Sequence, residues 1–378
     1  MVRYCSKNNK NRKSKIVIIL LLFALLILSF PLNQQNTVAK GEGNKSGYVV
    51  IEASSNRILK ASNEHLSMPM ASTTKIMTAI ITIEKANLKD IITIPKKAVG
   101  VEGSSIYLKV GQKISVSDLL YGLMLRSGND AAVALALHVA GSVEKFVALM
   151  NEKVNELGLT HTKFQNPHGL TQKNHYTSSY DLAVITSYAL KNEVFKDIVS
   201  TKMHVVKGET EAENQYFANK NRILYNYQGA NGVKTGYTIE AGRCLVASSE
   251  RDGMQVIAVA LNYYNYFELC SELMDYAHEN YYLEKIGDSS KPYAEAKVKK
   301  GKGVKKAELY LLEDRYYPLK KDGSEEVKTE INAKGEIIAP HEKTNSCGEV
   351  KFYVGNNLIF QEKLYTIYNI EKKWISIF

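Results

Sequence analysis

The sequence predicts a mixed α/β (α+β) fold: a large domain in which helices pack on one sheet, followed by a small all-β domain. Three observations support this prediction. Apolar runs typical of strands occur near residue 50 and again between residues 233 and 261. Helical periodicity dominates the stretch between them, and strand-like alternation returns after about residue 284. Because strands flank the helices on both sides, we expect one sheet to be assembled from both ends of the large domain.

The first 39 residues are typical of a targeting segment. A basic stretch without an acid precedes an apolar run from Ile16 to Leu32, and Thr37 to Ala39 offer a small residue for cleavage. We predict a signal peptide over residues 1–39. The alternative is an uncleaved anchor, because the run approaches the ~17–25 residues that can span a bilayer. Both alternatives place the domain outside the cytoplasm, at the outer face of the membrane or in the cell wall.

Composition agrees with an exported globular protein. Six basic residues of the leader account for six of the formal net charge of +10, which leaves +4 on the rest of the chain. Such a surplus favours residence near an anionic wall or membrane. Basic residues after Lys40 are dispersed apart from residues 297–306, which gives no case for nucleic-acid binding.

Cysteine usage indicates neither a disulfide framework nor a metal site. Cys5 lies ahead of the apolar run, and Cys244, Cys270 and Cys347 remain, an odd number at unrelated spacings. We expect buried free thiols, with a Cys244–Cys270 bridge as the alternative. No metal or cofactor is implied.

Residues 40–283 are predicted to form the large domain, which opens with a hairpin. Two short apolar runs, 48–51 and 57–59, flank a polar stretch. A helix is predicted to start at Pro69, whose fixed φ and missing N–H suit a first turn. The apolar face of that helix consists of Ile76, Met77, Ile80, Ile81 and Ile83.

Further helices and strands follow in order. Residues 116–140 have helical periodicity on both sides of a polar break at 127–129. Strands are expected around Gly242 and the turn at 251–253, where β propensity is high. The remaining predicted elements are helices over 146–157, 179–190 and 268–282, and strands over 233–238, 243–248 and 255–261.

Residues 284–363 are predicted to form the small β-rich domain. A Lys- and Gly-rich stretch leads to strand-like alternation, and Gly355 to Asn357 form a good hairpin turn. The predicted strands cover residues 307–311, 335–338, 349–354 and 358–360. This part contains no recognisable catalytic constellation, so we expect a spacer or a partner-docking module.

The tail, residues 364–378, has two interpretations. Its apolar residues fall on one helical face beside Lys372 and Lys373, the pattern of an amphipathic helix lying in a membrane interface. The alternative is a last strand or helix of the β domain. The apolar positions are Ile367, Ile370, Trp374, Ile377 and Phe378.

A hydroxyl and an amine lie three residues apart in the stretch from Pro69 to Thr78. Ser72 and Lys75 fall on one face of the predicted helix, because residues at i and i+3 are neighbours. In the first turn, Ser72 lies where backbone N–H groups are unpaired. The pair has the composition of a nucleophile beside a base, although such a four-residue pattern alone is a weak signal.

Two further motifs strengthen this interpretation. Ser127-Gly128-Asn129 lies between two predicted helices, and Lys234-Thr235-Gly236 lies on a predicted strand. The three motifs occur in the order found in penicillin-binding proteins and class A β-lactamases. With the flanking residues and Phe164–Leu170, the sequence resembles the low-molecular-weight penicillin-binding proteins that act as serine D-alanyl-D-alanine carboxypeptidases. The resemblance covers roughly Gly47 to Tyr282.

This resemblance implies a penicillin-binding/β-lactamase-like catalytic domain with an antiparallel sheet. It also implies removal of the terminal D-Ala from peptidoglycan stem peptides through an acyl-Ser72 intermediate, and acylation by β-lactam inhibitors. To act as the base, Lys75 must be buried or lie beside another cation, because the ordinary lysine pKa is near ~10.4. Lys234 can supply that charge. The resemblance leaves Lys234 protonated, holding the substrate carboxylate and polarising the Ser127 hydroxyl.

The same resemblance assigns the remaining site residues. Ser127 is the relay to the leaving amine, and Asn129 is a donor that positions the peptide or the Lys75 amine. The family geometry further places the Thr235 hydroxyl in the carboxylate site, Gly236 where the strand approaches the ligand, and the N–H groups of Ser72 and Tyr237 in the oxyanion hole.

Two departures from the family pattern stand out. Asn231 occupies a position where relatives commonly have Asp. Relatives often carry an Arg before the closing helix that helps to bind the terminal carboxylate, and residues 262–269 contain none. Arg243 is a candidate substitute, and a shifted substrate preference is the alternative. His168 and His175 are expected to be hydrogen-bonded structural residues, and Cys244 a buried strand residue.

Other functions remain open at this point. A D,D-endopeptidase or a β-lactamase would share the acylation step, but the deacylating Glu-x-x-Leu-Asn element of class A β-lactamases is absent between Ser127 and Lys234. The missing Arg and the extra β domain are also compatible with a non-catalytic wall-binding scaffold.

Overall fold

The structure, a computed structural model, describes residues 45–208 and 210–373. The predicted signal peptide and the last residues of the predicted tail, 374–378, lie outside the described residues. The large domain begins at the first strand, β1 (Gly47–Glu52).

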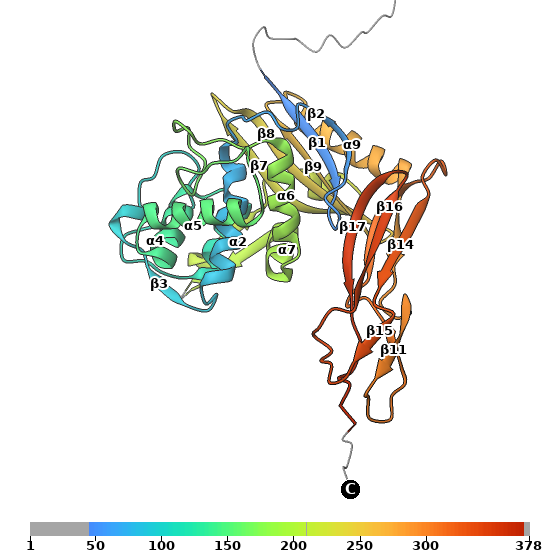
Figure 1. The fold of residues 1–378 in the computed structure, drawn as a ribbon. Helices are drawn as coiled ribbons and strands as arrows, with labels where there is room; N and C mark the ends of the chain where they lie inside the picture. The colour runs from blue at the N-terminus through green and yellow to red at the C-terminus, as the bar shows by residue number, and fades with distance from the viewer. Residues whose placement is uncertain (1–44, 209, 374–378) are drawn as a thin grey trace, which may run out of the picture. The chain divides into compact units, whose positions relative to one another are not determined.

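A five-stranded antiparallel sheet forms the centre of the large domain (Figure 1). Its strand order is β2-β1-β9-β8-β7, so the first strands of the chain pair with the last strand of the domain. Gly47 pairs with Leu261 and Glu52 with Val256. The sheet is therefore assembled from both ends of the domain, as predicted. The other strands are β2 (Ile58–Ser62), β7 (Ala230–Thr238), β8 (Gly242–Arg251) and β9 (Met254–Leu261).

The two faces of this sheet are covered by different helices because side chains alternate along each strand. Val49 and Ile51 pack in the core under helices α2 to α7, whereas Val50 packs in a second core under α9 (Tyr266–Asn280). Figure 1 shows these helices on opposite sides of the sheet. The helices of the larger layer are α2 (Lys75–Lys85), α3 (Val116–Leu125), α4 (Asn129–Ala140), α5 (Val143–Glu156), α6 (Ser179–Leu190) and α7 (Glu193–Ser200).

Several predicted helix boundaries are wrong, most clearly at the nucleophile segment and at the closing helix. The nucleophile segment is a 3-10 turn, η1 (Ala71–Thr74), rather than a helix from Pro69. Thr73 and Thr74 explain this, because their hydroxyls donate to the carbonyls of Met70 and Ala71, three residues earlier. The closing helix ends at Asn280, and the residues after it enter a strand.

Several short elements were not predicted, because each has few residues and depends on distant partners. Two small antiparallel sheets each have two strands: β3 pairs with β4, and β5 pairs with β6. The elements are β3 (Ile91–Thr93), η2 (Lys96–Ala98), β4 (Lys113–Ser115), β5 (Met203–Val206), η3 (Glu211–Glu213), β6 (Gln215–Ala218) and α8 (Ile223–Asn226).

The C-terminal part is all-β, which confirms the predicted fold class. It contains the sheets β10-β13, β12-β11-β15 and β14-β16-β17, with a separate core that includes Leu309 and Phe352. Arg57 of the large domain forms an ion pair with Glu325. The strands are β10 (Tyr281–Gly287), β11 (Ala294–Lys299), β12 (Lys306–Leu309), β13 (Arg315–Lys320), β14 (Val327–Ala333), β15 (Glu336–Ile338), β16 (Gly348–Val354) and β17 (Asn357–Leu364).

The helical interpretation of the tail is wrong for residues 364–373. Tyr365 bridges to Tyr310, and Ile370 bridges to His341. Ile370 is buried in the β-domain core, so it is unavailable to an amphipathic helix face. This stretch fits the alternative of a last extended segment of the β domain.

Among the described residues, no single helix is long and apolar enough to span a membrane, and the bent pair α4–α5 meets that test only when its two helices are taken together. The thiols of Cys244, Cys270 and Cys347 are buried and free, as expected.

Candidate active site

Ser72 lies in the short turn η1, directly before helix α2. Its side chain is only partly buried, so the hydroxyl can meet a ligand. Two glycines let other segments approach this turn. A Cβ on Gly169 would lie 1.9 Å from the Ala71 carbonyl oxygen, and a Cβ on Gly236 would lie 3.1 Å from the Ser72 nitrogen. The nucleophile is therefore held between a loop on one side and strand β7 on the other.

Lys75 is fully buried, and its amine lies beside the nucleophile. Nζ is 3.0 Å from Ser72 Oγ, 2.7 Å from Asn129 Oδ1 and 2.5 Å from the His168 carbonyl oxygen. Burial holds the pKa of Lys75 well below its ordinary value, and the charge of Lys234 lowers it further, against the opposing charge of Asp130. A neutral amine within hydrogen-bond distance of a serine hydroxyl is suited to act as its base.

Ser127 and Asn129 occupy the break between α3 and α4. Ser127 is buried and has a φ of 65°, a left-handed conformation that is uncommon for serine. Asn129 accepts a hydrogen bond from Lys75 and donates from Nδ2 to the Glu102 carbonyl, so it orients the amine as an acceptor rather than as a donor. Asp130 fixes the start of α4 by accepting hydrogen bonds from the backbone N–H groups of Ile106 and Leu108.

Lys234 is the second buried amine of the site, on strand β7. Its side chain is 2% exposed, and Nζ donates to the Thr235 carbonyl at 2.9 Å. Burial is the main cause that lowers the pKa of Lys234 to about 7. Thr235 is partly exposed and Tyr237 is exposed on the same strand. The protonation of Lys234 is thus poised near neutral pH, and burial disfavours the charged form of Lys75 as well.

A match over the large domain decides the family. The sequence profile described as D-alanyl-D-alanine carboxypeptidase matches residues 34–265, which is more than half of the chain. This chain belongs to the D-alanyl-D-alanine carboxypeptidase family of S11 peptidases. A second profile, the C-terminal domain of penicillin-binding protein 5, matches residues 281–372.

Individual relatives agree with this assignment to the S11 family. The D-alanyl-D-alanine carboxypeptidase DacF of Bacillus subtilis is 34% identical over 345 residues, 87% of each chain. DacD of Salmonella typhimurium is 31% identical over 86% of each chain. The crystal structure of penicillin-binding protein 5 from Haemophilus influenzae aligns with a TM-score of 0.73 and 30% identity, covering 86% of this chain and 97% of that one.

The histidines near the site of this S11 chain have structural partners. His175 shares a 2.8 Å hydrogen bond with the Thr74 hydroxyl, and its Nδ1 accepts from the Gln165 N–H. The carbonyl of His168 binds Lys75, and burial lowers the pKa of the imidazole of His168 to about 3. Burial also lowers the pKa of His175, to about 4, so both imidazoles are neutral at pH 7, as expected of structural residues. The contribution of the His168 main chain was missed, because a carbonyl has no signal in the sequence.

Arg243, the candidate substitute for the Arg that is missing from residues 262–269, lies on β8. It is directly opposite Tyr237 of β7. Its guanidinium lies over the rings of Tyr264 and Tyr266, with 4.8 and 5.8 Å to the ring centroids. It also donates to the Tyr264 carbonyl at 3.5 Å. Asn231 is the second departure from the family pattern. Its side chain donates to Gln255 and accepts from the Ser248 hydroxyl, and neither partner is a residue of the Ser72 site.

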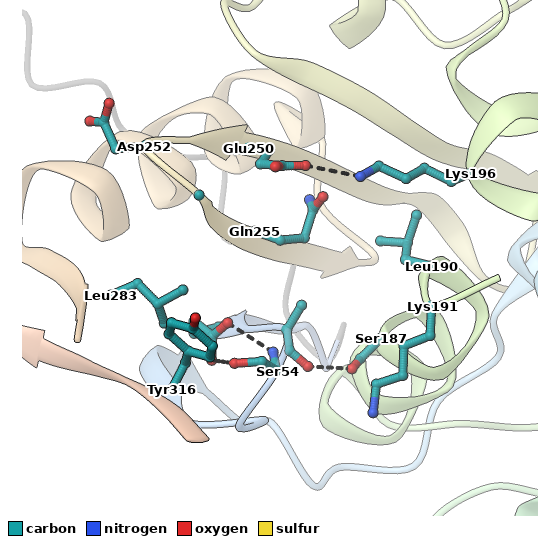
Figure 2. Close-up of a pocket in the computed structure, with 13 residues that line it drawn as sticks. Ser54, Ser187, Leu190, Lys191, Lys196, Glu250, Asp252, Gln255, Leu283 and Tyr316 are labelled. Atoms are coloured by element: carbon teal, nitrogen blue, oxygen red, sulfur yellow. Dashed lines mark hydrogen bonds and ion pairs between the residues drawn. The ribbon is translucent and has the colours of Figure 1, made fainter. Parts of the chain in front are cut away.

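A pocket of about 550 Å³ lies elsewhere in the molecule (Figure 2). Residues that line it include Ser54, Ser187, Lys191, Glu250 and Tyr316. None of the predicted site residues is among its lining residues, so the pocket is separate from the Ser72 site. The described residues also contain no group of three or more His, Cys, Asp and Glu side chains placed to hold a metal ion.

Proposed function

We propose that this chain is a serine D,D-carboxypeptidase that removes the terminal D-alanine from peptidoglycan stem peptides through an acyl-Ser72 intermediate. One observation carries the proposal: the buried amine of Lys75 lies 3.0 Å from the Ser72 hydroxyl and has a pKa well below its ordinary value. This pair supplies a nucleophile and its base without a histidine.

In the acylation step, Ser72 Oγ attacks the carbonyl of the penultimate residue while Lys75 accepts the hydroxyl proton. The bond to the terminal D-Ala nitrogen then breaks, and the Ser127 hydroxyl relays a proton to that nitrogen as it leaves. Water subsequently attacks the ester while the base takes its proton, and that proton passes to Ser72 Oγ as the bond between Ser72 Oγ and the acyl carbon breaks and the shortened peptide is released. The Ser72 and Tyr237 N–H groups would stabilise the oxygen that becomes negative in each tetrahedral intermediate.

Substrate binding is assigned to the strand that carries Lys234. In its protonated form, the Lys234 amine would pair with the carboxylate of the terminal residue, together with the Thr235 hydroxyl. The pKa of about 7 supports this role, because a bound anion favours the charged form and raises the pKa.

The direct test offers a peptide ending in D-Ala-D-Ala to the purified protein and assays the products. We expect free D-Ala, with no release by the Ser72→Ala variant. Split peptide dimers would instead identify a D,D-endopeptidase, and rapid opening of penicillin a β-lactamase. Absence of turnover in protein shown to be folded would favour a wall-binding scaffold.

We also propose that the protein is exported and makes peripheral contact with the membrane through its tail. Residues 364–373 belong to the β domain, so this contact would rest on Trp374, Ile377 and Phe378, next to Lys372 and Lys373. Sedimentation with anionic vesicles should decrease when residues 374–378 are deleted. Equal sedimentation of both proteins would contradict the proposed contact.

A further inference from the structure

The His168 carbonyl, which accepts a hydrogen bond from Lys75, belongs to a loop that one buried amide holds together. Asn166 Oδ1 accepts from the N–H groups of His168 at 3.3 Å and of Gly169 at 2.7 Å. Its Nδ2 donates to the Leu170 carbonyl at 3.0 Å. Asn166 therefore ties the next residues of the loop into a turn, and this turn sets the direction of the His168 carbonyl.

Thr78 attaches the same loop to helix α2. Its side chain is fully buried, and its hydroxyl donates to the Pro167 carbonyl at 2.6 Å. Ser72, Lys75 and Thr78 are spaced by three residues, so they follow one another along one face of the turn and the helix. The Thr78 hydroxyl and the Lys75 amine therefore bind two consecutive carbonyls of the loop, those of residues 167 and 168.

The neighbours of Lys75 determine which way its amine faces. A neutral amine has two N–H groups and one lone pair. Asn129 Oδ1, at 2.7 Å, and the His168 carbonyl oxygen, at 2.5 Å, can only accept hydrogen bonds, so together they take both N–H groups. The lone pair is then left for the third neighbour, the Ser72 hydroxyl at 3.0 Å. The two acceptors thus direct the lone pair to the proton that the base has to take.

We propose that Thr78 and Asn166 are positioning residues of the acylation step. They fix the His168 carbonyl, and this carbonyl directs the lone pair of Lys75 to the Ser72 hydroxyl. The inference rests on the proposed function, in which Lys75 is the base. The Thr78 hydroxyl is bonded to the loop and not to Ser72, so its contribution to the reaction passes through the loop and the Lys75 amine.

The first test compares two fully buried threonines of helix α2. Thr78→Val removes the donor to the loop. Thr82→Val is the matched control, because it makes the same change one turn further along, where the hydroxyl donates to the Thr78 carbonyl at 2.8 Å. Acylation by a chromogenic cephalosporin is followed at increasing concentrations, which gives the limiting rate and the apparent dissociation constant of each folded variant.

A misplaced base slows the reaction without weakening the binding of the drug. In Thr78→Val the limiting rate should therefore fall about tenfold or more, while the dissociation constant stays within about twofold of wild type. Both values should stay within about threefold in Thr82→Val. Thr78→Ser restores the donor and should recover most of the rate.

A double-mutant cycle separates positioning from a structural role. Because Thr78 is proposed to act through the Lys75 amine, Thr78→Val should cost about tenfold in the wild-type background and less than about twofold in Lys75→Gln. Asn166→Ala releases the same carbonyl from the other end. It should show the same dependence on Lys75, which provides the test if Thr78→Val does not fold.

Three results would overturn the proposal. They are equal losses in the wild-type and Lys75→Gln backgrounds, a loss that lies in the dissociation constant, and a limiting rate of folded Thr78→Val within about threefold of wild type. Failure of the folded wild type to react with the cephalosporin would instead refute the proposed function.

Discussion

The large domain and the β domain treat polar groups differently. Residues 45–280 bury two lysines, Asp130 and many hydroxyls and amides, whereas Thr366 is the only buried polar residue among the described residues from 281 onwards. Charges of the β domain lie instead at the surface, as in the exposed pair Lys306–Glu295 at 2.7 Å. The large domain therefore bears the free-energy costs of burying polar and charged groups, whereas the described part of the β domain bears almost none.

Those costs have a physical origin. Burying an amine disfavours its charged form, which destabilises the fold but supplies a neutral base and an amine that titrates near pH 7. The β domain has a small apolar core with no such groups, which fits a role in support or docking.

Replacing the buried base should have the largest effect. Lys75→Gln keeps a polar side chain but cannot take the proton of Ser72, so acylation by penicillin should slow by about 10²–10⁴-fold. Lys85→Gln, an exposed lysine at the end of the same helix, is the matched control and should change the rate less than about twofold. Stopped-flow or gel-based acylation assays measure both. A rate within about threefold of wild type in Lys75→Gln would show that the burial of Lys75 serves no catalytic purpose.

The pH dependence should follow Lys234. Burial lowers its pKa to about 7, so the free enzyme loses this positive charge as pH rises through neutrality. The second-order constant for substrates ending in a carboxylate should therefore fall about tenfold per pH unit well above pH 7. In Lys234→Arg the charge persists, because the arginine pKa exceeds ~12, and this limb should disappear. The measurement is the second-order acylation constant from about pH 5.5 to 9 for both proteins. An unchanged alkaline limb in Lys234→Arg would mean that another group causes this limb.

The sequence alone predicts some residues of the site but not others. Ser72 and Lys75 were predictable because three-residue spacing places them on one face whether the turn is 3-10 or α-helical. Ser127, Asn129 and Lys234 came from the family resemblance, since neither periodicity nor spacing brings residues so far apart in the chain together. The structure brings the Asn129 side chain directly to Lys75, and the charge of Lys234 lowers the pKa of Lys75.

Other features had no sequence signal. The His168 carbonyl binds Lys75 through its main chain, which every residue possesses. The pairing of β10 with β13 joins residues that are well separated in the chain. The helical interpretation of the tail was wrong because Ile370 has helical spacing in the sequence but packs into the β-domain core. Tertiary contacts therefore override local pattern in these places.

A core substitution in the β domain should affect stability and leave the chemistry intact. Phe352 is fully buried there, so Phe352→Ala should reduce the free energy of unfolding by about 3–5 kcal/mol. Acylation per folded molecule should stay within about twofold of wild type if the two domains divide the roles as described. Urea unfolding measures the free energy of unfolding, and titration of the penicillin-reactive fraction gives the acylation rate per folded molecule. A large rate loss in the folded fraction would break the comparison.

The smallest effect is expected for an exposed ion pair. Glu295→Gln removes the partner of Lys306, and such pairs contribute little, so the free energy of unfolding should change by less than about 0.5 kcal/mol. The same unfolding assay measures it at low and moderate salt. A loss above about 2 kcal/mol would mean that surface charges carry part of the β-domain stability.

The central claim is that Ser72 is an assembled nucleophile. Its most direct test is intact-mass analysis of the folded protein, residues 40–378, after incubation with penicillin, followed by peptide mapping. We predict an adduct of one drug molecule located on Ser72 and absent from Ser72→Ala. No adduct on protein shown to be folded, or an adduct that maps to another residue and persists in Ser72→Ala, would contradict the account.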